Sequence, residues 1–324
     1  MILDTIAGLR RAGVLGLNCR NSGYTLKYNR RRFYPLVDDK VLCKRRLQER
    51  GLAVPDLIAL VEFNRQAAHL AELLGDHTEF VIKPAHGSGG SGILVITGRR
   101  ADYYLDNAGK LVMPDDLAHH LTNVIGGLYS LGGQPDVAMI ETLVHFDPLF
   151  AQLTYHGVPD IRVIVFKGYP VMAMTRLPTR MSHGKANLHQ GAIGAGIDLA
   201  TGITFGGVSG NRLVTEHPDT GHRIEGFRVP HWPMIVAMAA QCYEAVGLGY
   251  LGCDIVLDRD LGPLILELNA RPGLNIQLAN RRGLRSRLDA VEALESPHET
   301  PQQRVEWSCR MFGDPNTESL VHSS

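Results

Sequence analysis

Two apolar runs, rich in β-branched residues, flank a short polar stretch at residues 258–262 and are typical of the two strands of a β-hairpin. The first run contains Asp254, and the second contains Glu267, followed two positions later by Asn269. If the hairpin is centred between residues 260 and 261, Asp254 lies directly opposite Glu267. Asn269 then shares the face of Glu267, because strand side chains alternate between the two faces. The pattern therefore predicts two carboxylates and a carboxamide close together.

The chemistry of these three side chains indicates a metal site. Like charges that face each other across a sheet repel, and a bound cation removes that repulsion. Oxygen ligands alone suit a hard cation such as Mg²⁺. The alternative is the exposed polar face of an ordinary hairpin, although the flanking residues are too apolar for a freely solvated strand.

A glycine-rich stretch between two further predicted strands indicates a phosphate-binding loop. The first strand, residues 80–83, ends at Pro84 because proline cannot continue a sheet ladder, and the second follows at residues 93–97. The glycines allow positive φ and let backbone N–H groups approach phosphate oxygens, while Lys83 adds a positive charge. The alternative is a flexible surface hairpin with a solvated lysine. The loop residues expected to bind phosphate are Gly87, Ser88, Gly89 and Gly90.

The order of the lysine, the glycines and the strands excludes three familiar nucleotide-binding motifs. A Rossmann turn opens a helix, whereas the residues after these glycines are typical of a strand. A Walker loop carries its lysine after the glycines, and a protein kinase carries it on a later strand. Here the order is strand, lysine, glycine hairpin, strand.

The rest of the chain mixes predicted helices and strands without a regular alternation, which favours an α+β fold with mainly antiparallel sheets. Helices are expected at residues 1–16, 41–50, 67–74, 114–129 and 233–246, and again between the hairpin and about residue 294. Strands are expected at residues 138–144, 161–166 and 171–176, a glycine-rich loop with short strands at 191–210, and polar, basic loops at 18–21 and 27–32. The polar tail after Ser296 is expected to be loosely ordered.

The charge balance, the cysteines and the lengths of the apolar runs exclude some classes of function. The 324 residues contain 33 basic and 33 acidic side chains, and this balance argues against a general role in binding nucleic acid. The five cysteines are scattered, which is typical of reduced thiols in a cytoplasmic protein. No apolar run reaches the roughly 20 residues that a membrane span needs.

Taken together, these motifs resemble the ATP-grasp superfamily, and more closely its α-L-glutamate ligase-like (RimK-type) members. The resemblance covers residues 38–287. It rests on the lysine–glycine unit, on a glutamate at a strand end, on two middle segments and on the metal hairpin; in this chain these are Lys83 to Gly92, Glu141, Asp160-Ile-Arg162, Asn187-Leu-His189-Gln-Gly, and Asp254 to Glu267-Leu-Asn269-Ala-Arg-Pro-Gly.

The resemblance implies an α+β, ATP-grasp fold in which two α+β subdomains with antiparallel sheets clamp ATP, without a full N-terminal pre-ATP-grasp domain. The expected organisation is an N-terminal basic segment at residues 1–37 and an ATP-grasp domain at 38–295. Within that domain the glycine-loop lobe covers about 38–140 and the metal-binding lobe about 141–295, and a polar tail follows at 296–324.

The resemblance also implies a role for each site residue. Lys40 and Lys83 would reach the ATP phosphates, and Glu141 would accept a hydrogen bond from the adenine amino group. The purine edge would meet the backbone of Leu143 and Val144, and the ribose would meet Asp147. Two Mg²⁺ ions, or Mn²⁺ in their place, would be held by Asp254, Glu267 and Asn269. The expected catalytic residues are Arg162, Asn187 and Arg271. Two alternatives stay open: Glu141 as a strand-end carboxylate in solvent, and Arg162 as a structural partner of Asp160.

The implied reaction is ATP-dependent ligation of a carboxylate to an amine through an acyl phosphate, with an amino acid such as glutamate added to a peptide or small amine. The alternatives are a phosphotransferase, an ATP-grasp enzyme of a sugar or cell-envelope pathway, or a nucleotide-binding scaffold. The basic segment at residues 18–32 is expected to contact an anionic substrate, or else a second copy or partner chain completes the acceptor site.

Overall fold

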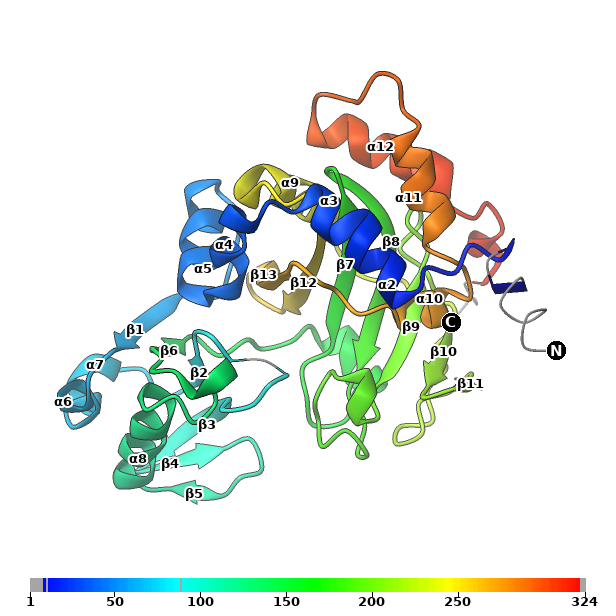
Figure 1. Cartoon of the computed structure of the whole chain (residues 1–324). Helices are drawn as coiled ribbons and strands as arrows, with labels where there is room; N and C mark the ends of the chain where they lie inside the picture. Colours follow the sequence, from blue (N-terminus) through cyan, green and yellow to red (C-terminus); the bar gives the residue numbers. More distant parts are fainter. Residues whose placement is uncertain (1–7, 10, 88, 321–324) are drawn as a thin grey trace. The chain divides into compact units, whose positions relative to one another are not determined.

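The computed structural model describes residues 8, 9, 11–87 and 89–320, and the chain forms two compact units (Figure 1). The smaller unit takes Asp38–Arg45 and Val54–Val144. The larger unit takes Met1–Val37, Arg46–Ala53 and His145–Ser324. Each unit has its own antiparallel sheet, which confirms the predicted α+β class.

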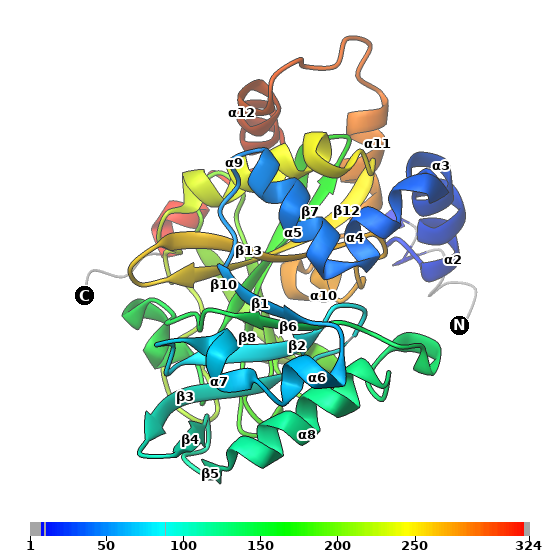
Figure 2. The same cartoon turned by 90° about the vertical axis from the view of Figure 1, so that its left-hand side faces the viewer.

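The smaller unit is built on a six-stranded sheet in the order β1-β6-β2-β3-β4-β5. Alternate residues of β2 are buried, and helix α8 runs along this sheet (Figure 2). Leu117, Leu121 and Val124 of α8 are buried in the same core. Its strands are β1 Leu57–Val61, β2 Phe80–Pro84, β3 Leu94–Arg100, β4 Tyr103–Asp106, β5 Leu111–Val112 and β6 Ala138–Glu141. Its helices include α6 Asn64–Ala67, α7 Leu70–Leu74 and α8 Pro114–Ile125, and helix α5 Lys40–Glu49 begins in this unit.

The larger unit is built on a seven-stranded sheet in the order β11-β10-β9-β8-β7-β12-β13. Every residue of β7 and β12 is buried, as expected for central strands covered on both faces. Its strands are β7 Asp160–Phe166, β8 Tyr169–Leu177, β9 Ile193–Ile197, β10 Thr204–Ser209, β11 Arg212–Val214, β12 Tyr250–Asp258 and β13 Gly262–Asn269. Helices α9 Trp232–Val246, α10 Ile276–Asn280, α11 Arg285–Glu292 and α12 Pro301–Phe312 pack on this sheet or on one another.

The predicted hairpin is present as β12 and β13. Asp254 lies directly opposite Glu267, as expected from the sequence. The register shifts by one residue between Asp254 and Ile255, so the turn is centred on Asp260 and not between residues 260 and 261. A β-bulge of this kind twists the strand locally and re-aims the side chains beside it.

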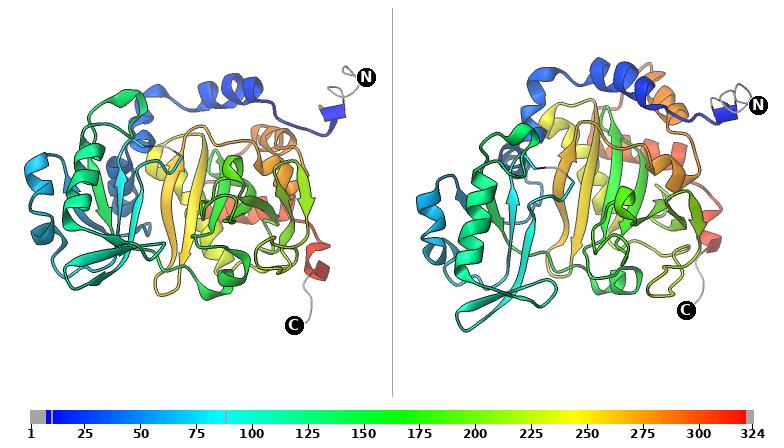
Figure 3. Two further views of the ribbon diagram at one scale, coloured as in Figure 1. Left: turned by 90° about the horizontal axis from the view of Figure 1, so that it is seen from below. Right: turned by 60° about the horizontal axis from the view of Figure 1, so that its bottom comes forward.

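The basic segment at residues 18–32 is mostly helical, so the predicted loops there are wrong. It forms α2 Leu17–Cys19, a π-helix at Arg20–Thr25, α3 Leu26–Tyr28 and a 3₁₀ turn at Arg31–Phe33, before α4 Pro35–Asp38. Tyr24 and Tyr28 pack edge-on against Phe166, with ring centroids 5.6 and 4.9 Å away. Hydrogen bonds to α11, such as Tyr24 to Asp289 at 2.9 Å, hold the segment beside that helix (Figure 3). Part of the helix predicted at residues 1–16 falls on residues 1–7 and 10, which lie outside the described residues.

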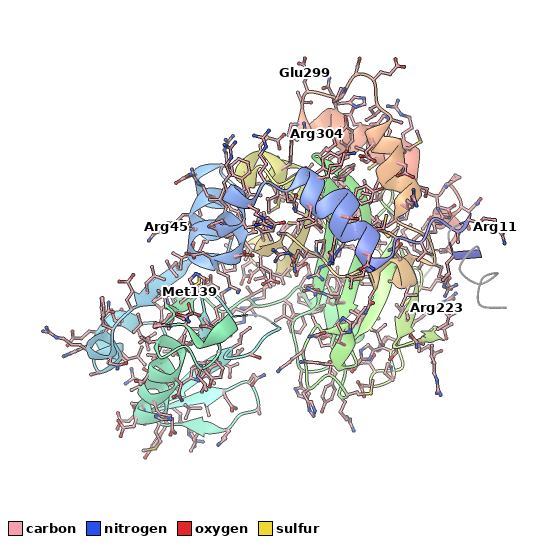
Figure 4. All side chains as sticks on the ribbon, viewed as in Figure 1. Arg11, Arg45, Met139, Arg223, Glu299 and Arg304 are labelled. Carbon is pink, nitrogen blue, oxygen red and sulfur yellow. The ribbon has the colours of Figure 1, made fainter. Side chains whose placement is uncertain are left out.

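The tail after Ser296 is not loosely ordered along its whole length, because residues 301–312 form helix α12. Arg304 of α12, labelled in Figure 4, is buried, forms an ion pair with Glu244 of α9 and donates to the carbonyl of Gly168. Trp307 packs edge-on against Tyr169 at 5.2 Å. These contacts join the tail to the sheet. No helix among the described residues is long and apolar enough to cross a membrane.

Candidate nucleotide and metal site

A buried lysine–glutamate cluster lies in the smaller unit. Glu141, at the end of β6, is only 2% exposed. Its Oε1 atom lies 2.6 Å from Lys44 Nζ, and its Oε2 atom pairs with Lys83, whose side chain is 11% exposed. A buried carboxylate needs such cations, because removing an unpaired charge from water is very unfavourable. Glu141 is therefore not a strand-end carboxylate in solvent, and Lys83 is not a solvated lysine.

Lys44 was not predicted from the sequence as a site residue. It lies one helical turn after Lys40 on α5, and this i,i+4 spacing is the signal that could have pointed to it. Burial lowers the pKa of Lys44 below its ordinary value, and the carboxylate of Glu141 only partly offsets this effect. The cluster thus combines two lysines with one carboxylate, and this excess of positive charge suits a phosphate.

The glycine-rich loop joins β2 to β3, and these strands pair antiparallel, which confirms the predicted order of strand, lysine, glycine hairpin and strand. Gly89 and Gly90 have φ of 64° and 77°. Gly92 has φ of 76°, and a Cβ there would lie 2.5 Å from the ring of Tyr129, so this position requires glycine. Ser88 lies outside the described residues. Lys40 Nζ donates to the carbonyl of Gly87 at 2.5 Å, which places this lysine at the base of the loop.

A histidine at the same end of the loop was also missed. His86 Nδ1 lies 2.7 Å from Asp136 Oδ1, and Ser130 Oγ donates to the other oxygen of Asp136 at 2.6 Å. Burial would raise the pKa of Asp136, but the hydrogen bonds from Ser130 and His86 outweigh it and lower the pKa. These contacts fix the residue that precedes Gly87. A lone histidine beside a glycine carries no sequence signal for them.

A second charged cluster crosses four strands of the larger unit. Asp254 on β12 faces Arg162 on β7 and Glu267 on β13 in register. Arg162 Nε donates to Asp254 Oδ1 at 2.7 Å, and its Nη2 donates to Oδ2 at 2.5 Å. Arg176 on β8 donates to the same Oδ2 at 2.8 Å and pairs with Asp160 on β7. Arg162 is therefore a partner of Asp254 and not of Asp160, and Arg176 is a member of the cluster that the sequence interpretation missed.

The charges in this cluster shift one another's pKa values. Burial alone would raise the pKa of Asp254, but the guanidinium groups of Arg162 and Arg176 outweigh it and lower the pKa to about 2. Burial raises the pKa of Asp160 to about 6 in spite of its pairing with Arg176. Asp254 is thus held as a carboxylate, which is the form that a metal ligand requires.

The oxygen donors of this cluster fit a hard cation. No group of three or more His, Cys, Asp and Glu side chains in the described part of the chain has metal-site geometry, so a metal would also need the Asn269 carboxamide. The Asp254 carboxylate accepts three hydrogen bonds from guanidinium N–H groups. Of its roughly four lone pairs, about one therefore remains for a metal ion. Glu267 and Asn269 are only partly buried. The set therefore fits Mg²⁺ chiefly through Glu267 and Asn269, with Asp254 as a further ligand.

The other predicted site residues have local roles in the structure. Asp147 caps a 3₁₀ turn by accepting from the backbone N–H two residues later at 2.8 Å, and Asn187 does the same at 3.0 Å. Leu143 and Val144 lie half-buried in the extended segment after β6. The guanidinium of Arg271 lies 4.6 Å from the ring centroid of Tyr34. Arg271 also donates its backbone N–H to the Asn269 side chain at 2.8 Å, next to the metal hairpin.

Arg20 is a structural residue. It is 7% exposed, and its Nη1 donates to the carbonyl oxygens of Arg271 and Pro272 at 3.2 and 2.8 Å. Neutralising Arg20 would therefore disturb the chain around the metal hairpin. Within the segment at residues 18–32, Arg20 is therefore a buried packing residue and is not exposed to solvent.

Comparison with known proteins identifies the family. The model of the family described as sugar-transfer associated ATP-grasp matches residues 19–293. This match confirms the ATP-grasp fold class, and it includes the helical basic segment from Cys19 onward. Membership of the glutamate ligase-like group stays a prediction. No curated protein matches the chain at a significant level.

Several solved structures are similar at low identity. One is the ATP-grasp ligase PsnB complexed with a minimal precursor, with 16% identity, a TM-score of 0.43, and coverage of 81% of this chain and 62% of that one. D-alanine–D-alanine ligase from Bacillus anthracis has 17% identity and a TM-score of 0.41, with coverage of 86% of this chain and 70% of that one. D-alanyl-alanine synthetase A from Vibrio cholerae has 10% identity and a TM-score of 0.47, with coverage of 86% of this chain and 66% of that one. This chain thus spans less than two thirds of the length of PsnB.

Proposed function

Because the chain belongs to the sugar-transfer associated ATP-grasp family, we propose that it is an ATP-dependent carboxylate–amine ligase that uses Mg²⁺. The observation that carries the proposal is the paired Asp254 and Glu267 across β12 and β13, with two arginines fixing the first carboxylate. The lysine–glutamate cluster and glycine loop support it from the other unit.

The proposed reaction has two steps. A carboxylate oxygen of the first substrate attacks the γ-phosphorus of ATP, the bond to the β,γ-bridging oxygen breaks, and an acyl phosphate and ADP form. The amine of the second substrate then attacks the acyl carbon, phosphate leaves with the bonding electrons, and the amine nitrogen loses a proton. Phosphoryl transfer depends mainly on positioning and on neutralising charge.

The residues of this chain would supply that positioning. Lys40, Lys44 and Lys83 would bind the phosphates, and the glycine loop would exclude water from the acyl phosphate. Glu267 and Asn269, with Asp254, would hold Mg²⁺, which neutralises phosphate charge when bound. Arg162, Asn187 and Arg271 remain the proposed groups for the substrate and the transferred phosphoryl. Since a lysine ammonium group lies at ion-pair distance from each oxygen of Glu141, its reading of the adenine amino group is a proposal that nucleotide selectivity would test.

Membership of this family favours a substrate from a sugar pathway over a peptide that accepts glutamate. The words sugar-transfer associated point to an acceptor or a carboxylate linked to a sugar pathway, in preference to addition of glutamate to a peptide. A phosphotransferase is the second candidate, because the first step alone would give a phosphorylated product. The two differ in whether an amine stimulates release of ADP.

Nucleotide binding should depend on Mg²⁺ and should stabilise the fold. At 100 times its Kd, a ligand adds about 2.7 kcal/mol to the free energy of unfolding. Thermal unfolding is measured with a non-hydrolysable ATP analogue, with Mg²⁺ and with chelator, and the larger rise in Tm is expected with Mg²⁺. If the analogue raises Tm in neither condition, the nucleotide part of the proposal is wrong. An equal rise with the GTP analogue would contradict adenine recognition by Glu141.

A further inference from the structure

A pocket of about 470 Å³ lies in the larger unit, and no residue of the β12–β13 hairpin lines it. Its walls are the turn between α10 and α11, one face of α11, the end of α12 and the chain around Ala12. This volume is in the range of small-molecule sites. The lining residues that matter most are Arg281, Arg282, Ser286, Arg287, Met311 and Phe312.

Tight backbone packing builds one wall of this pocket. A Cβ on Gly283 would lie 2.1 Å from the carbonyl oxygen of Gly13, so only glycine permits this approach. Arg285 N donates to that same carbonyl at 3.0 Å. Leu15 N donates to Gln277 at 2.7 Å, and Gln277 donates back to the carbonyl of Leu15 at 3.1 Å. Residues 13–15 are thus fixed against the α10–α11 turn.

Arg287 is held rigidly at the pocket. Its Nη1 donates to the carbonyl of Val171 at 2.7 Å and its Nη2 to the carbonyl of Phe312 at 3.2 Å. The guanidinium also lies 5.1 Å from the ring centroid of Phe312. Because two carbonyls and a ring fix the group, little side-chain freedom remains to be lost when a ligand binds.

The pocket has an excess of positive charge. Arg282 pairs with Asp314 at 2.5 Å. Within residues 11–87 and 89–320, neither Arg281 nor Arg287 forms an ion pair with a carboxylate. Burial, with the nearby Arg282, lowers the pKa of Arg287 to about 10 although Asp198 opposes this. A partly buried cation without a carboxylate is unfavourable, and an anionic ligand would relieve it.

We propose that this pocket binds the phosphate group of a small phosphorylated ligand, as a second anion site separate from the proposed nucleotide site. Guanidinium groups form charge-assisted, paired hydrogen bonds to phosphate, and the three arginines outnumber the two nearby carboxylates, Asp314 and Asp198. Met311, which is 55% exposed, and Phe312 offer an apolar surface to the rest of the ligand. The proposal does not depend on ligase activity.

Pyrophosphate is the probe, and its affinity for the full chain is measured by calorimetry without Mg²⁺. Arg281→Gln should weaken binding by about tenfold or more, since a charge-assisted hydrogen bond is lost. Arg310→Gln, an exposed arginine of α12 outside the lining, is the matched control and should bind as the unaltered protein does. Lys83→Met alters the proposed nucleotide site, and the part of the pyrophosphate binding that depends on Arg281 should persist in this variant. Arg287→Lys keeps the positive charge but cannot form the paired hydrogen bonds of a guanidinium, so it should also weaken pyrophosphate binding. This variant tests the proposal independently if Arg281→Gln unfolds.

A vesicle assay separates a free phosphate ligand from a lipid phosphate. Vesicles of neutral lipid, with and without phosphatidic acid, are sedimented with the unaltered protein and with Arg281→Gln. Sedimentation that needs phosphatidic acid and is reduced in Arg281→Gln would identify a lipid as the source of the phosphate. Binding of pyrophosphate alone would identify a free ligand. The proposal is overturned if neither probe binds, if Arg281→Gln and Arg310→Gln bind equally, or if Lys83→Met alone abolishes binding.

Discussion

Glu267→Gln is expected to lower the rate of ADP formation by about 10²–10³-fold while leaving the protein folded. The change removes the charge of the carboxylate that, with Asn269, offers the more exposed oxygens of the proposed metal site. It also removes one negative charge that faces Asp254 across the hairpin, and Arg162 and Arg176 still pair with Asp254, so the metal-free protein should stay folded. Steady-state kinetics at several Mg²⁺ concentrations, together with thermal unfolding, measure both effects.

The matched control for this variant is Glu299→Gln. Glu299 is exposed and precedes α12 (Figure 4), so losing its charge should change neither activity nor Tm. Partial recovery of Glu267→Gln at high Mg²⁺ would support weakened metal binding. A Glu267→Gln enzyme with the kinetics of the control would remove the hairpin from the mechanism.

Glu141→Gln is expected to lower the free energy of unfolding by about 3–5 kcal/mol. The carboxylate is buried between the ammonium groups of Lys44 and Lys83, and its loss leaves two like charges together in the core of the smaller unit. The pKa of Lys44 should fall further in this variant, since burial already lowers it and the opposing carboxylate is lost. Urea unfolding of the variant, followed by circular dichroism, measures the change.

Glu62→Gln is the control for that measurement, because Glu62 is an exposed carboxylate of the same unit. Addition of Lys83→Met to Glu141→Gln should restore part of the stability by removing one of the two unpaired lysines. Equal stability of the Glu141→Gln and Glu62→Gln proteins would show that the lysines do not need this carboxylate, and the cluster would then have no structural role.

The hairpin could be predicted from the sequence because its chemistry is local. Two apolar runs around a short polar turn fix both the strands and the facing of Asp254 and Glu267. The glycine loop was predictable for the same reason. The one-residue bulge beside Asp254 was not, since it depends on how β12 pairs with β7 and β13 together.

The partners of the charged groups could not be predicted. Arg176 meets Asp254 only because β8 and β12 flank β7, and that order depends on the whole sheet. Lys44 meets Glu141 across a long stretch of sequence. The segment at residues 18–32 is polar and has too few apolar residues at helical spacing to predict a helix. Its helices are stabilised by the packing of Tyr24 and Tyr28 against Phe166.

The most direct test of the central claim is to trap the acyl phosphate. The full chain is incubated with ATP, Mg²⁺ and hydroxylamine, with amino acids or sugar acids as carboxylates, and hydroxamate and ADP are measured together. A ligase of this kind should form both in equal amounts with at least one carboxylate, and a suitable amine should replace hydroxylamine and give the amide by mass spectrometry. ADP formed together with a stable phosphorylated product, and no hydroxamate with any carboxylate, would contradict the account and identify a phosphotransferase.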